Sequence, residues 1–549
     1  MWLKSTILFL VLMAYSTLHA QVSEKILLET DKQWYYPGEP IWFGLNVLDA
    51  CNGHLSSSSK VAYVELVDSE NKPVYQTSVS LHDAHGDGSL AISDAISTGT
   101  YHLVAYTNWM KNFGASVYAH RLVQIVNPVK PGRVAKTAEA AATKSDFDVG
   151  IQIPQTVYNT RDRIPISIST DKGYRVSVSV FRVDDLQTNN NIGFGSSDAD
   201  PCGLPAKQNV KSLMENRGHI VKARVTDKRS QQPVSGIRTY LSVVQTPNKI
   251  YVATSDSTGN VYFEVDELSG RGELVMQTNR SADSNYVVEV IQPYVNEKPT
   301  TTLAATTDVL TGASSAIDDA LFSAQVQKIF HAPAPASKMK EADTLPFYGK
   351  PDAFYLMSDY QHFSTVEEIL REYVTTVGVQ RRRGKLQPIV YDILSGNRPF
   401  NDPPLILING VPEFDHSHFM EMNTDEFESI AVMAHKYVIG HQVFHGIIDV
   451  KLNVPLRNFG RNVTVADYSG PAINAEFNFP VYDNEAARNS KIPDFRNVLY
   501  WRSSLPVNRQ GKSFVQFYAS DLEGEYAIVV RAVSADGKVG YATTKIQIR

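Results

Sequence analysis

The sequence predicts a mainly β protein, a string of Ig-like and similar β-sandwich domains with one small α+β domain. Three observations support this class. Short runs of alternating apolar and polar residues recur along most of the 549 residues, separated by turn residues. Tyrosine, which favours strands, occurs 27 times, and the turn formers glycine and proline 32 and 27 times. Only near residues 363–453 does a run with helical spacing precede continuous apolar strands.

The N-terminal 20 residues have the three regions of a secretory signal peptide. Lys4 precedes an apolar run over Ile7–Met13, and the small residue Ala20 closes the segment. After this segment no stretch of the sequence is apolar for the roughly 18 residues that a membrane-spanning helix needs. We therefore expect an exported chain without a transmembrane segment, located in the periplasm, associated with the outer membrane, or at the cell surface.

Charge and cysteine content narrow the function classes. The formal net charge of −6 disfavours nucleic acid as a partner, and we expect the isolated basic run Arg381–Lys385 to be a solvated strand or loop edge. Cys51 and Cys202 are the two cysteines, too few for a disulfide framework. Free buried thiols are the default expectation, and a disulfide between the two is the alternative.

The main evidence for the first domain is a turn between two strand-like runs. Pro37 and Gly38 turn the chain, Glu39 caps the turn, and Ile41 and Phe43 point to one face. The segment reads Asp-Lys-Gln-Trp-Tyr-Tyr-Pro-Gly-Glu and resembles the Asp-(Arg/Lys)-x-x-Tyr-x-Pro-Gly-Glu signature of macroglobulin-type domains. The resemblance implies a β-sandwich.

The middle of the chain adds further alternating strands. Ile164–Ile168 and Val176–Val180 are the clearest. Val225 to Gly236, with its Val-x-Asp and Pro-Val-x-Gly elements, resembles the start of carboxypeptidase-regulatory-like and Ig-like domains, which is weak evidence on function. An Ala/Ser/Thr-rich linker follows, with one expected helix over Asp318–Phe330.

The most specific pattern lies in the α+β region. Thr365 and the acidic residues after it predict a capped helix start. Leu405–Ile408 predicts a buried strand that enters a tight turn at Asn409-Gly410, Asp425–Ile430 a short amphipathic turn before a second strand, and Gly446–Lys451 a third strand. These elements, in this order, resemble the plug domain of TonB-dependent outer-membrane receptors.

The barrel that such a plug fills is not part of this sequence. Only 96 residues follow Asn453, whereas a barrel of about 22 strands needs several hundred. The resemblance therefore implies a plug-like domain that docks to another protein. As domains we expect a signal peptide (1–20), a macroglobulin-type sandwich (21–128), a linker (129–145), a second sandwich (146–212), an Ig-like or carboxypeptidase-regulatory-like domain (213–295), a linker (296–345), the plug-like domain (346–453) and a C-terminal Ig-like domain (454–549).

The motifs tested for chemistry favour no reaction. Neither cysteine lies in the Cys-x-Glu-Gln setting of a macroglobulin thioester, and no nucleophile elbow or zinc-protease motif is present in the sequence. We expect the histidines to be exposed or hydrogen-bonded rather than metal ligands; those that cluster are His416, His418, His435, His441 and His445. The sequence thus predicts no catalytic, cofactor-binding or metal-binding residue, and leaves the partner-binding residues unknown.

Together these features predict a non-enzymatic binding or scaffold protein of the Gram-negative cell envelope. Its plug-like domain would dock to an outer-membrane barrel, a receptor or a secretion component, so envelope or outer-membrane proteins are the expected partners. Two alternatives remain open: a macroglobulin-like binder of proteases or surface ligands without a thioester, and a hydrolase with an unrecognised site. The oligomeric state is not predicted.

Overall fold

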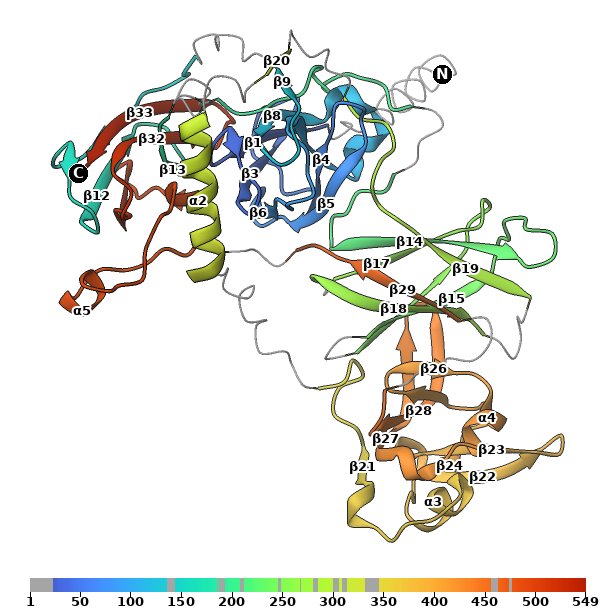
Figure 1. Cartoon of the computed structure of the whole chain (residues 1–549). Coiled ribbons are helices and arrows are strands. Elements are labelled where there is room, and N and C mark those ends of the chain that lie inside the picture. The colour runs from blue at the N-terminus through green and yellow to red at the C-terminus, as the bar shows by residue number, and fades with distance from the viewer. Residues whose placement is uncertain are drawn as a thin grey trace, which may run out of the picture. The chain divides into compact units, whose positions relative to one another are not determined.

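The fold was obtained as a computed structural model. It describes residues 23–135, 144–184, 186, 193–207, 212–244, 248–266, 268–279, 285–299, 306–308, 314–330, 345–455, 463–472 and 476–549. The expected signal peptide, residues 1–20, lies outside this range. The chain is mainly β and divides into two compact units, each interrupted in sequence (Figure 1). Unit 1 comprises Met1–Asn216, Val295–Ala336 and Asn474–Arg549, and unit 2 comprises Arg217–Tyr294 and Ser337–Ile473.

The N-terminal sandwich of unit 1 has a three-stranded sheet, β1-β3-β6, and a five-stranded sheet, β2-β8-β7-β4-β5. Its strands are β1 (Glu24–Thr30), β2 (Trp34–Tyr35), β3 (Pro40–Asp49), β4 (Val61–Val67), β5 (Pro73–Ser80), β6 (His85–Ala91), β7 (Gly99–Thr107) and β8 (Ala119–Ile125), and two short helices, η1 (Trp109–Asn112) and η2 (Ala115–Val117), precede β8. Ile41 and Phe43 are fully buried on one face of β3, as expected. The Glu39 carboxylate accepts a hydrogen bond from the Tyr36 N–H at 3.1 Å and so caps the turn, in which Gly38 has φ 91°.

The second sandwich of unit 1 is assembled from both ends of the chain. We expected separate domains over 146–212 and 454–549, but the structure joins strands of both stretches in the same two sheets, β10-β12-β31 and β11-β33-β32-β13-β30. One core results, with Ile166, Val178, Phe517 and Ile528 buried in it. The strands are β10 (Val149–Gln152), β11 (Val157–Tyr158), β12 (Arg163–Thr170), β13 (Arg175–Arg182), β30 (Val498–Pro506), β31 (Lys512–Tyr518), β32 (Gly524–Val533) and β33 (Val539–Ile548). Alternation reveals a strand and its buried face but not its neighbour, which is why the sequence did not show this pairing.

The expected linkers carry structure that packs on unit 1. β9 (Arg133–Ala135) pairs with β20 (Thr306–Asp308), and the expected helix is α2 (Ser314–Phe330). Ile317 and Ala320 of α2 pack against residues of the N-terminal sandwich, including Trp34 and Val126, while the Phe322 ring contacts Phe495, 5.8 Å away between centroids, just before β30. The helix therefore contacts both sandwiches.

Cys51 and Cys202 form a disulfide, so the default expectation of free thiols is wrong. The segment around Cys202 returns across the N-terminal sandwich. There the Leu28 N–H donates to the Gly195 carbonyl at 3.0 Å, and the Ser23 hydroxyl donates to the Pro201 carbonyl at 3.2 Å. This return brings together two cysteines that are 151 residues apart in sequence. No local sequence pattern predicts their pairing.

Unit 2 contains an Ig-like sandwich, with sheets β17-β14-β19 and β16-β15-β18-β29. Its strands are β14 (His219–Asp227), β15 (Arg238–Val244), β16 (Lys249–Thr254), β17 (Asn260–Val265), β18 (Arg271–Thr278), β19 (Tyr286–Ile291) and β29 (Val463–Ser469). Val221, Leu241, Phe263 and Met276 lie in its core. β29 belongs to the stretch that we expected to start the C-terminal domain, and it instead forms the outer strand beside β18.

The α+β domain of unit 2 follows the predicted order of elements. Its main sheet has the order β21-β27-β28-β25-β26, in which β25 runs parallel to β28 and the other pairs are antiparallel. The elements are β21 (Ala353–Leu356), η3 (Met357–Asp359), α3 (Val366–Glu372), β22 (Val377–Arg382), β23 (Lys385–Asp392), η4 (Ile393–Ser395), β24 (Arg398–Pro399), β25 (Leu405–Ile408), β26 (Val411–Glu413), α4 (His416–Met420), η5 (Thr424–Glu426), β27 (Phe427–Ile439) and β28 (Gln442–Leu452). The strand over Leu405–Ile408 has the predicted bounds, and Asn409 and Gly410 have φ 48° and 78°, as the predicted tight turn requires.

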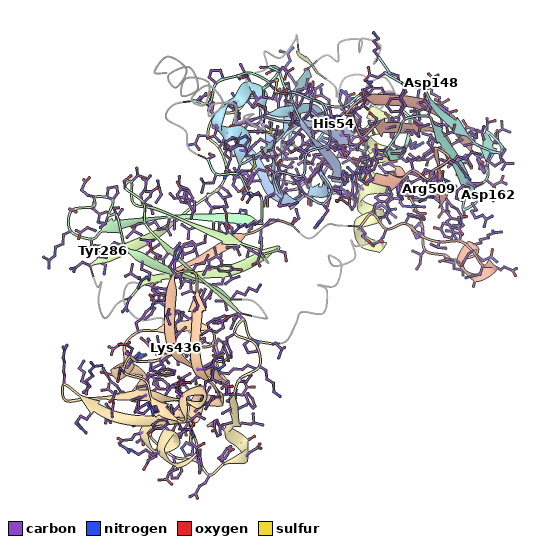
Figure 2. The ribbon with its side chains drawn as sticks, turned by 180° about the vertical axis from the view of Figure 1, so that it is seen from behind. His54, Asp148, Asp162, Tyr286, Lys436 and Arg509 are labelled. Carbon is purple, nitrogen blue, oxygen red and sulfur yellow. A yellow bond between two sulfur atoms is a disulfide. The ribbon has the colours of Figure 1, made fainter. Side chains whose placement is uncertain are left out.

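Two details position the surface described next. Thr365 accepts a hydrogen bond from the Glu368 N–H at 3.2 Å, while its hydroxyl donates to the Glu368 carboxylate at 2.7 Å, which confirms the capped start of α3. The hairpin of β27 and β28, marked by Lys436 in Figure 2, reaches from the α+β domain to the Ig-like sandwich of the same unit. Its Phe444 shares an apolar cluster with Tyr240 and Ile250 of that sandwich.

Among the helices of the described residues, none is both long and apolar enough to cross a membrane.

Candidate binding surface

The surface starts from β21, an outer strand of the main sheet of the α+β domain. β21 pairs with β27 in an antiparallel register that places Ala353 opposite Val432 and Leu356 opposite Ser429. Within the described residues no strand pairs with its other side. An edge strand of this kind presents backbone N–H and C=O groups that a further strand can pair with.

The side chains of β21 alternate between the core and the exterior. Ala353 and Tyr355 pack against the core of the domain. Phe354 and Leu356 point the other way and are 60% and 37% exposed. Tyr360, four residues beyond the strand, is 39% exposed. Large apolar side chains concentrated at one strand edge are typical of a docking site, whereas isolated exposed apolar residues are ordinary.

A row of aromatic rings continues from this edge. The centroid distances are 6.1 Å between Tyr355 and Tyr360, 4.6 Å between Tyr360 and Tyr373, and 5.2 Å between Tyr373 and Phe363. The Tyr373 hydroxyl donates to the Gln361 carbonyl at 2.8 Å. The row is therefore held in place by α3, at whose C-terminal end Tyr373 lies.

The surroundings of this row are acidic. Residues 350–373 and 421–428 contain nine carboxylates against two lysine or arginine side chains. The two stretches are in contact, since Thr424 donates a hydrogen bond to the Phe363 carbonyl at 2.6 Å. In the part of the chain that the structure describes, Asp359, Glu372 and Glu426 have no ion-pair partner within 4.0 Å. A negative potential therefore accompanies the apolar edge.

The opposite charge gathers elsewhere in the same domain. Arg381 to Lys385 form the exposed tip of the β22–β23 hairpin, as expected of a solvated strand edge. Arg383 and Gly384 have positive φ values of 51° and 83° at the turn, and the Arg381 guanidinium donates to the Gly384 carbonyl at 3.1 Å. The domain thus has an acidic side and a basic tip.

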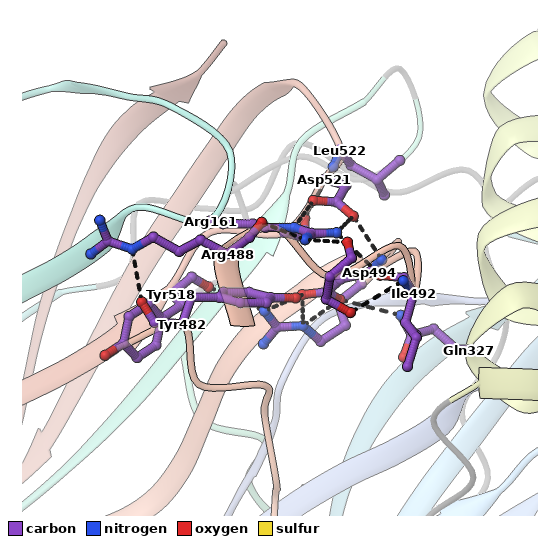
Figure 3. Close-up of polar contacts among 12 residues, drawn as sticks. Arg161, Gln327, Tyr482, Arg488, Ile492, Asp494, Tyr518, Asp521 and Leu522 are labelled. Carbon is purple, nitrogen blue, oxygen red and sulfur yellow. Dashed lines mark hydrogen bonds and ion pairs between the residues drawn. The ribbon is translucent and has the colours of Figure 1, made fainter. Parts of the chain in front are cut away.

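A network of charged residues in unit 1 holds the long connection before β30 (Figure 3). Arg161 contacts both oxygens of Asp521 at 2.6 and 2.7 Å, and it also donates to the carbonyls of Arg488, Ser490 and Ile492. Arg488 ends α5 (Glu485–Arg488), a short helix in this connection. The arginine therefore fastens the connection to the sandwich.

The second half of this network is buried. Arg496 donates to both oxygens of Asp494, with the shortest contact at 2.7 Å, and the Tyr482 hydroxyl donates to Asp494 at 2.9 Å. Burial raises the pKa of Tyr482, and the charge of Asp494 acts in the same direction. Because both carboxylate oxygens of Asp494 already accept hydrogen bonds, the arrangement suits a structural lock better than a catalytic acid or base.

A further buried cluster joins the two sandwiches of unit 1. Glu29 of β1 accepts a hydrogen bond from Ser177 of β13 and lies 3.5 Å from the guanidinium of Arg531 of β32. Burial raises the pKa of Glu29, and the positive charge of Arg531 opposes this. His85 lies 3.1 Å from the Ser503 hydroxyl, and burial lowers its pKa to about 3. Glu29, Ser177 and Arg531 are buried and His85 is partly buried, so these contacts stabilise the packing of the two sandwiches.

Three of the clustered histidines lie beside carboxylates, each beside a different one. His418 is 2.9 Å from Glu413, and His435 is 3.0 Å from Asp352. His445 is 3.6 Å from Asp402, His441 lies exposed in a turn, and burial lowers the pKa of His416. No group of three metal-ligand side chains occurs among the residues that the structure describes.

The edge strand was missed by the sequence reasoning, which found no partner-binding residue. Its signal is weak, because Ala353–Leu356 is a run of only four residues, Ala-Phe-Tyr-Leu, without polar alternation. The pattern predicts a short strand but does not say which of its sides lacks a neighbour.

Comparison with known proteins gives no assignment. No protein-family model and no curated protein matches the chain. The crystal structure of trypsin-activated alpha-2-macroglobulin from Escherichia coli aligns with 96% of this chain at 10% identity and a TM-score of 0.25. Salmonella alpha-2-macroglobulin reacted with methylamine gives the same three values. Dimeric latent PorU from Porphyromonas gingivalis aligns with 49% of this chain and 33% of its own, at 11% identity and a TM-score of 0.17.

The chain spans about two fifths of the length of these macroglobulins, 41% and 40% respectively. At such TM-scores the likeness carries no argument about fold or function. The case for a function therefore depends on the surfaces of the chain itself.

Proposed function

We propose that this chain is a non-enzymatic binding or scaffold protein of the Gram-negative cell envelope that docks partner proteins through its α+β domain. One observation supports the proposal: the edge strand β21 exposes Phe354 and Leu356 on one face, while a row of aromatic rings starts at Tyr355 on its other face. Exposed strand edges and aromatic surfaces are recurrent elements of protein recognition.

Two features support a location of this chain in the cell envelope. The N-terminal residues have the composition of a signal peptide. The Cys51–Cys202 disulfide, whose cysteines are both exposed, suits an oxidising compartment such as the periplasm. A bond at the surface of a protein in a reducing cytosol would be open to reduction.

The order of elements in the α+β domain supports a plug-like role. A capped helix, a buried strand that leads into Asn409-Gly410, and two long strands follow one another, in the order on which the sequence resemblance to receptor plugs rests. In this proposal the domain acts on a barrel, receptor or secretion component supplied by another protein. The binding role needs no reaction centre, which is consistent with the closed hydrogen bonding of Asp494 and Arg496.

The test is capture of partners from cross-linked cell envelopes of the source organism. The bait is the full chain after the signal peptide, and the comparison is with F354S/L356S, which removes the apolar edge. The matched control is F514S, because Phe514 is 63% exposed on β31, an outer strand of a different sheet. We expect outer-membrane or envelope proteins to be captured by the unaltered chain and by F514S, and at least ten-fold less of them by F354S/L356S.

Recovery of no envelope protein, or equal recovery with all three baits, contradicts the proposal. Circular dichroism of the variants checks that they are folded. Because both altered side chains are exposed, we expect changes in stability within about 0.5 kcal/mol.

A further inference from the structure

The charge around the edge strand identifies a kind of partner. We propose that β21 binds an extended, basic segment of a partner protein, which adds a strand to the sheet and places its apolar side chains on Phe354 and Leu356. This inference rests on the proposed docking function and specifies its chemistry. Strand addition of this kind combines backbone hydrogen bonds for affinity with side-chain contacts for selectivity.

The backbone geometry of β21 is the evidence that a further strand can pair with it. β21 lies at the edge of a five-stranded sheet and is already held in register by β27. Residues of an edge strand alternately direct their N–H and C=O groups outward, so an incoming strand finds donors and acceptors in fixed positions. The incoming strand orders only itself, because the template is preformed.

The exposed side chains of β21 are the evidence that the incoming segment has apolar residues at alternate positions. A strand beside β21 alternates its residues between the two faces of the sheet. Those on the face of Tyr355 lie on the side of the aromatic row, since the Tyr355 ring contacts Tyr360. Those on the other face meet Phe354 and Leu356. Apolar residues at every second position of the incoming segment would cover this surface and remove it from water.

The acidic residues near β21 are the evidence that the incoming segment is basic. Asp359 ends η3, the short helix that directly follows β21, and Glu372 precedes Tyr373 of the aromatic row. Glu426 ends η5, which contacts the segment at Phe363. None of the three is neutralised by an ion pair within the described residues. Lysine or arginine residues at the remaining positions of the incoming segment would meet this acidic surface, whereas an acidic segment would be repelled.

Two other occupants compete with this one. The basic tip at Arg381–Lys385 of a second copy could reach the acidic surface and produce self-association. A divalent cation could bind to the carboxylates instead. The experiments described next distinguish the basic segment from a second copy of the chain and from a divalent cation.

The probe is a fluorescein-labelled octapeptide that alternates lysine and valine, titrated with the full chain after the signal peptide and followed by fluorescence anisotropy. Two comparison peptides share its length. One replaces lysine with glutamate, and one carries N-methyl groups on alternate residues, which block strand pairing. We expect the lysine-valine peptide to bind at least ten-fold more tightly than either comparison peptide.

Variants of the chain then locate the site. We expect F354S/L356S to weaken the lysine-valine peptide at least ten-fold, and D359N/E372Q/E426Q about five-fold with a smaller dependence on salt. F514S, the matched exposed phenylalanine on β31, should bind as the unaltered chain does. Equal binding of the N-methylated or the glutamate peptide, or an equal loss in F514S, overturns the proposal.

Light scattering and chelation test the competing occupants. A concentration-dependent dimer that is abolished by R381E/R382E/R383E would assign the surface to a second copy, and loss of peptide binding with EDTA would assign it to a cation-dependent contact; either result overturns the proposal. Envelope capture that depends on Phe354 and Leu356, without binding of the lysine-valine peptide, refutes the basic strand but leaves the docking function standing. Failure of both experiments refutes both.

Discussion

Removal of the disulfide provides a quantitative test of how unit 1 is stabilised. The substitution is C51A/C202A. Hydrogen bonds flank the disulfide along the returning segment, from Leu28–Gly195 on one side to the contact between the Lys207 N–H and the Asn112 carbonyl, 2.7 Å, on the other. We therefore expect the variant to keep its secondary structure and its returning segment in place. The loss should appear in the free energy of unfolding.

The size of this loss follows from the length of the closed loop. The two cysteines are 151 residues apart in sequence. Closing a loop of that length removes conformational entropy from the unfolded chain worth about 5 kcal/mol at 25 °C, an upper value for disulfides. Because both cysteines are exposed, their replacement loses little packing. We expect the variant to be less stable by about 3–5 kcal/mol, which for a unit of this size corresponds to a fall of roughly 4–8 °C in the Tm of unit 1.

Differential scanning calorimetry with and without dithiothreitol measures this effect and contains its own control. Reductant should lower the transition of the unaltered chain to that of C51A/C202A and should leave the variant unchanged. A variant that unfolds within 1 °C of the unaltered chain would refute the reasoning. So would an equal shift of both proteins on addition of reductant.

Three further predictions concern other elements. R161M leaves the Asp521 carboxylate without its bidentate partner and should destabilise the second sandwich by about 3 kcal/mol, with new cleavage of the connection before β30 in limited proteolysis; unchanged cleavage would contradict the lock. Burial raises the pKa of Asp449 to about 6, above its unfolded value of 3.8, so this group stabilises unit 2 fully below pH 4 and the contribution, about 3 kcal/mol, is lost as the pH rises through 6. D449N should therefore flatten the pH dependence of unit 2 stability between pH 4 and 8, and a profile like that of the unaltered chain would refute this. T365A removes the cap of α3 and should reduce stability in urea unfolding by about 1 kcal/mol, whereas T365S should retain it.

Local features of the fold were predictable from the sequence. Leu405–Ile408 is a continuous apolar run and forms a buried strand, and Asn409-Gly410 supplies the two positive φ angles of its turn. Thr365 with Glu368 three residues later specifies the start of α3. Each of these signals depends on a few consecutive residues, so it can be recognised from one sequence alone.

Long-range relations were not predictable in the same way. β12 pairs with β31, and β18 pairs with β29, although the two strands of each pair lie far apart in the sequence. The alternation of a strand defines its two faces but leaves its neighbours open, so the division into domains differed from the observed sheets. The disulfide depends on a returning segment without regular structure. The candidate surface depends on which side of β21 lacks a neighbour, and only the assembled sheet shows that.

Site-specific photo-cross-linking in living cells tests the docking account most directly. A photoreactive phenylalanine analogue would replace Phe354 in one strain and Phe514, of similar exposure, in another. The account predicts a covalent adduct with an envelope protein at position 354 and none at position 514. An absence of adducts at position 354, or the same adducts at both positions, would contradict it.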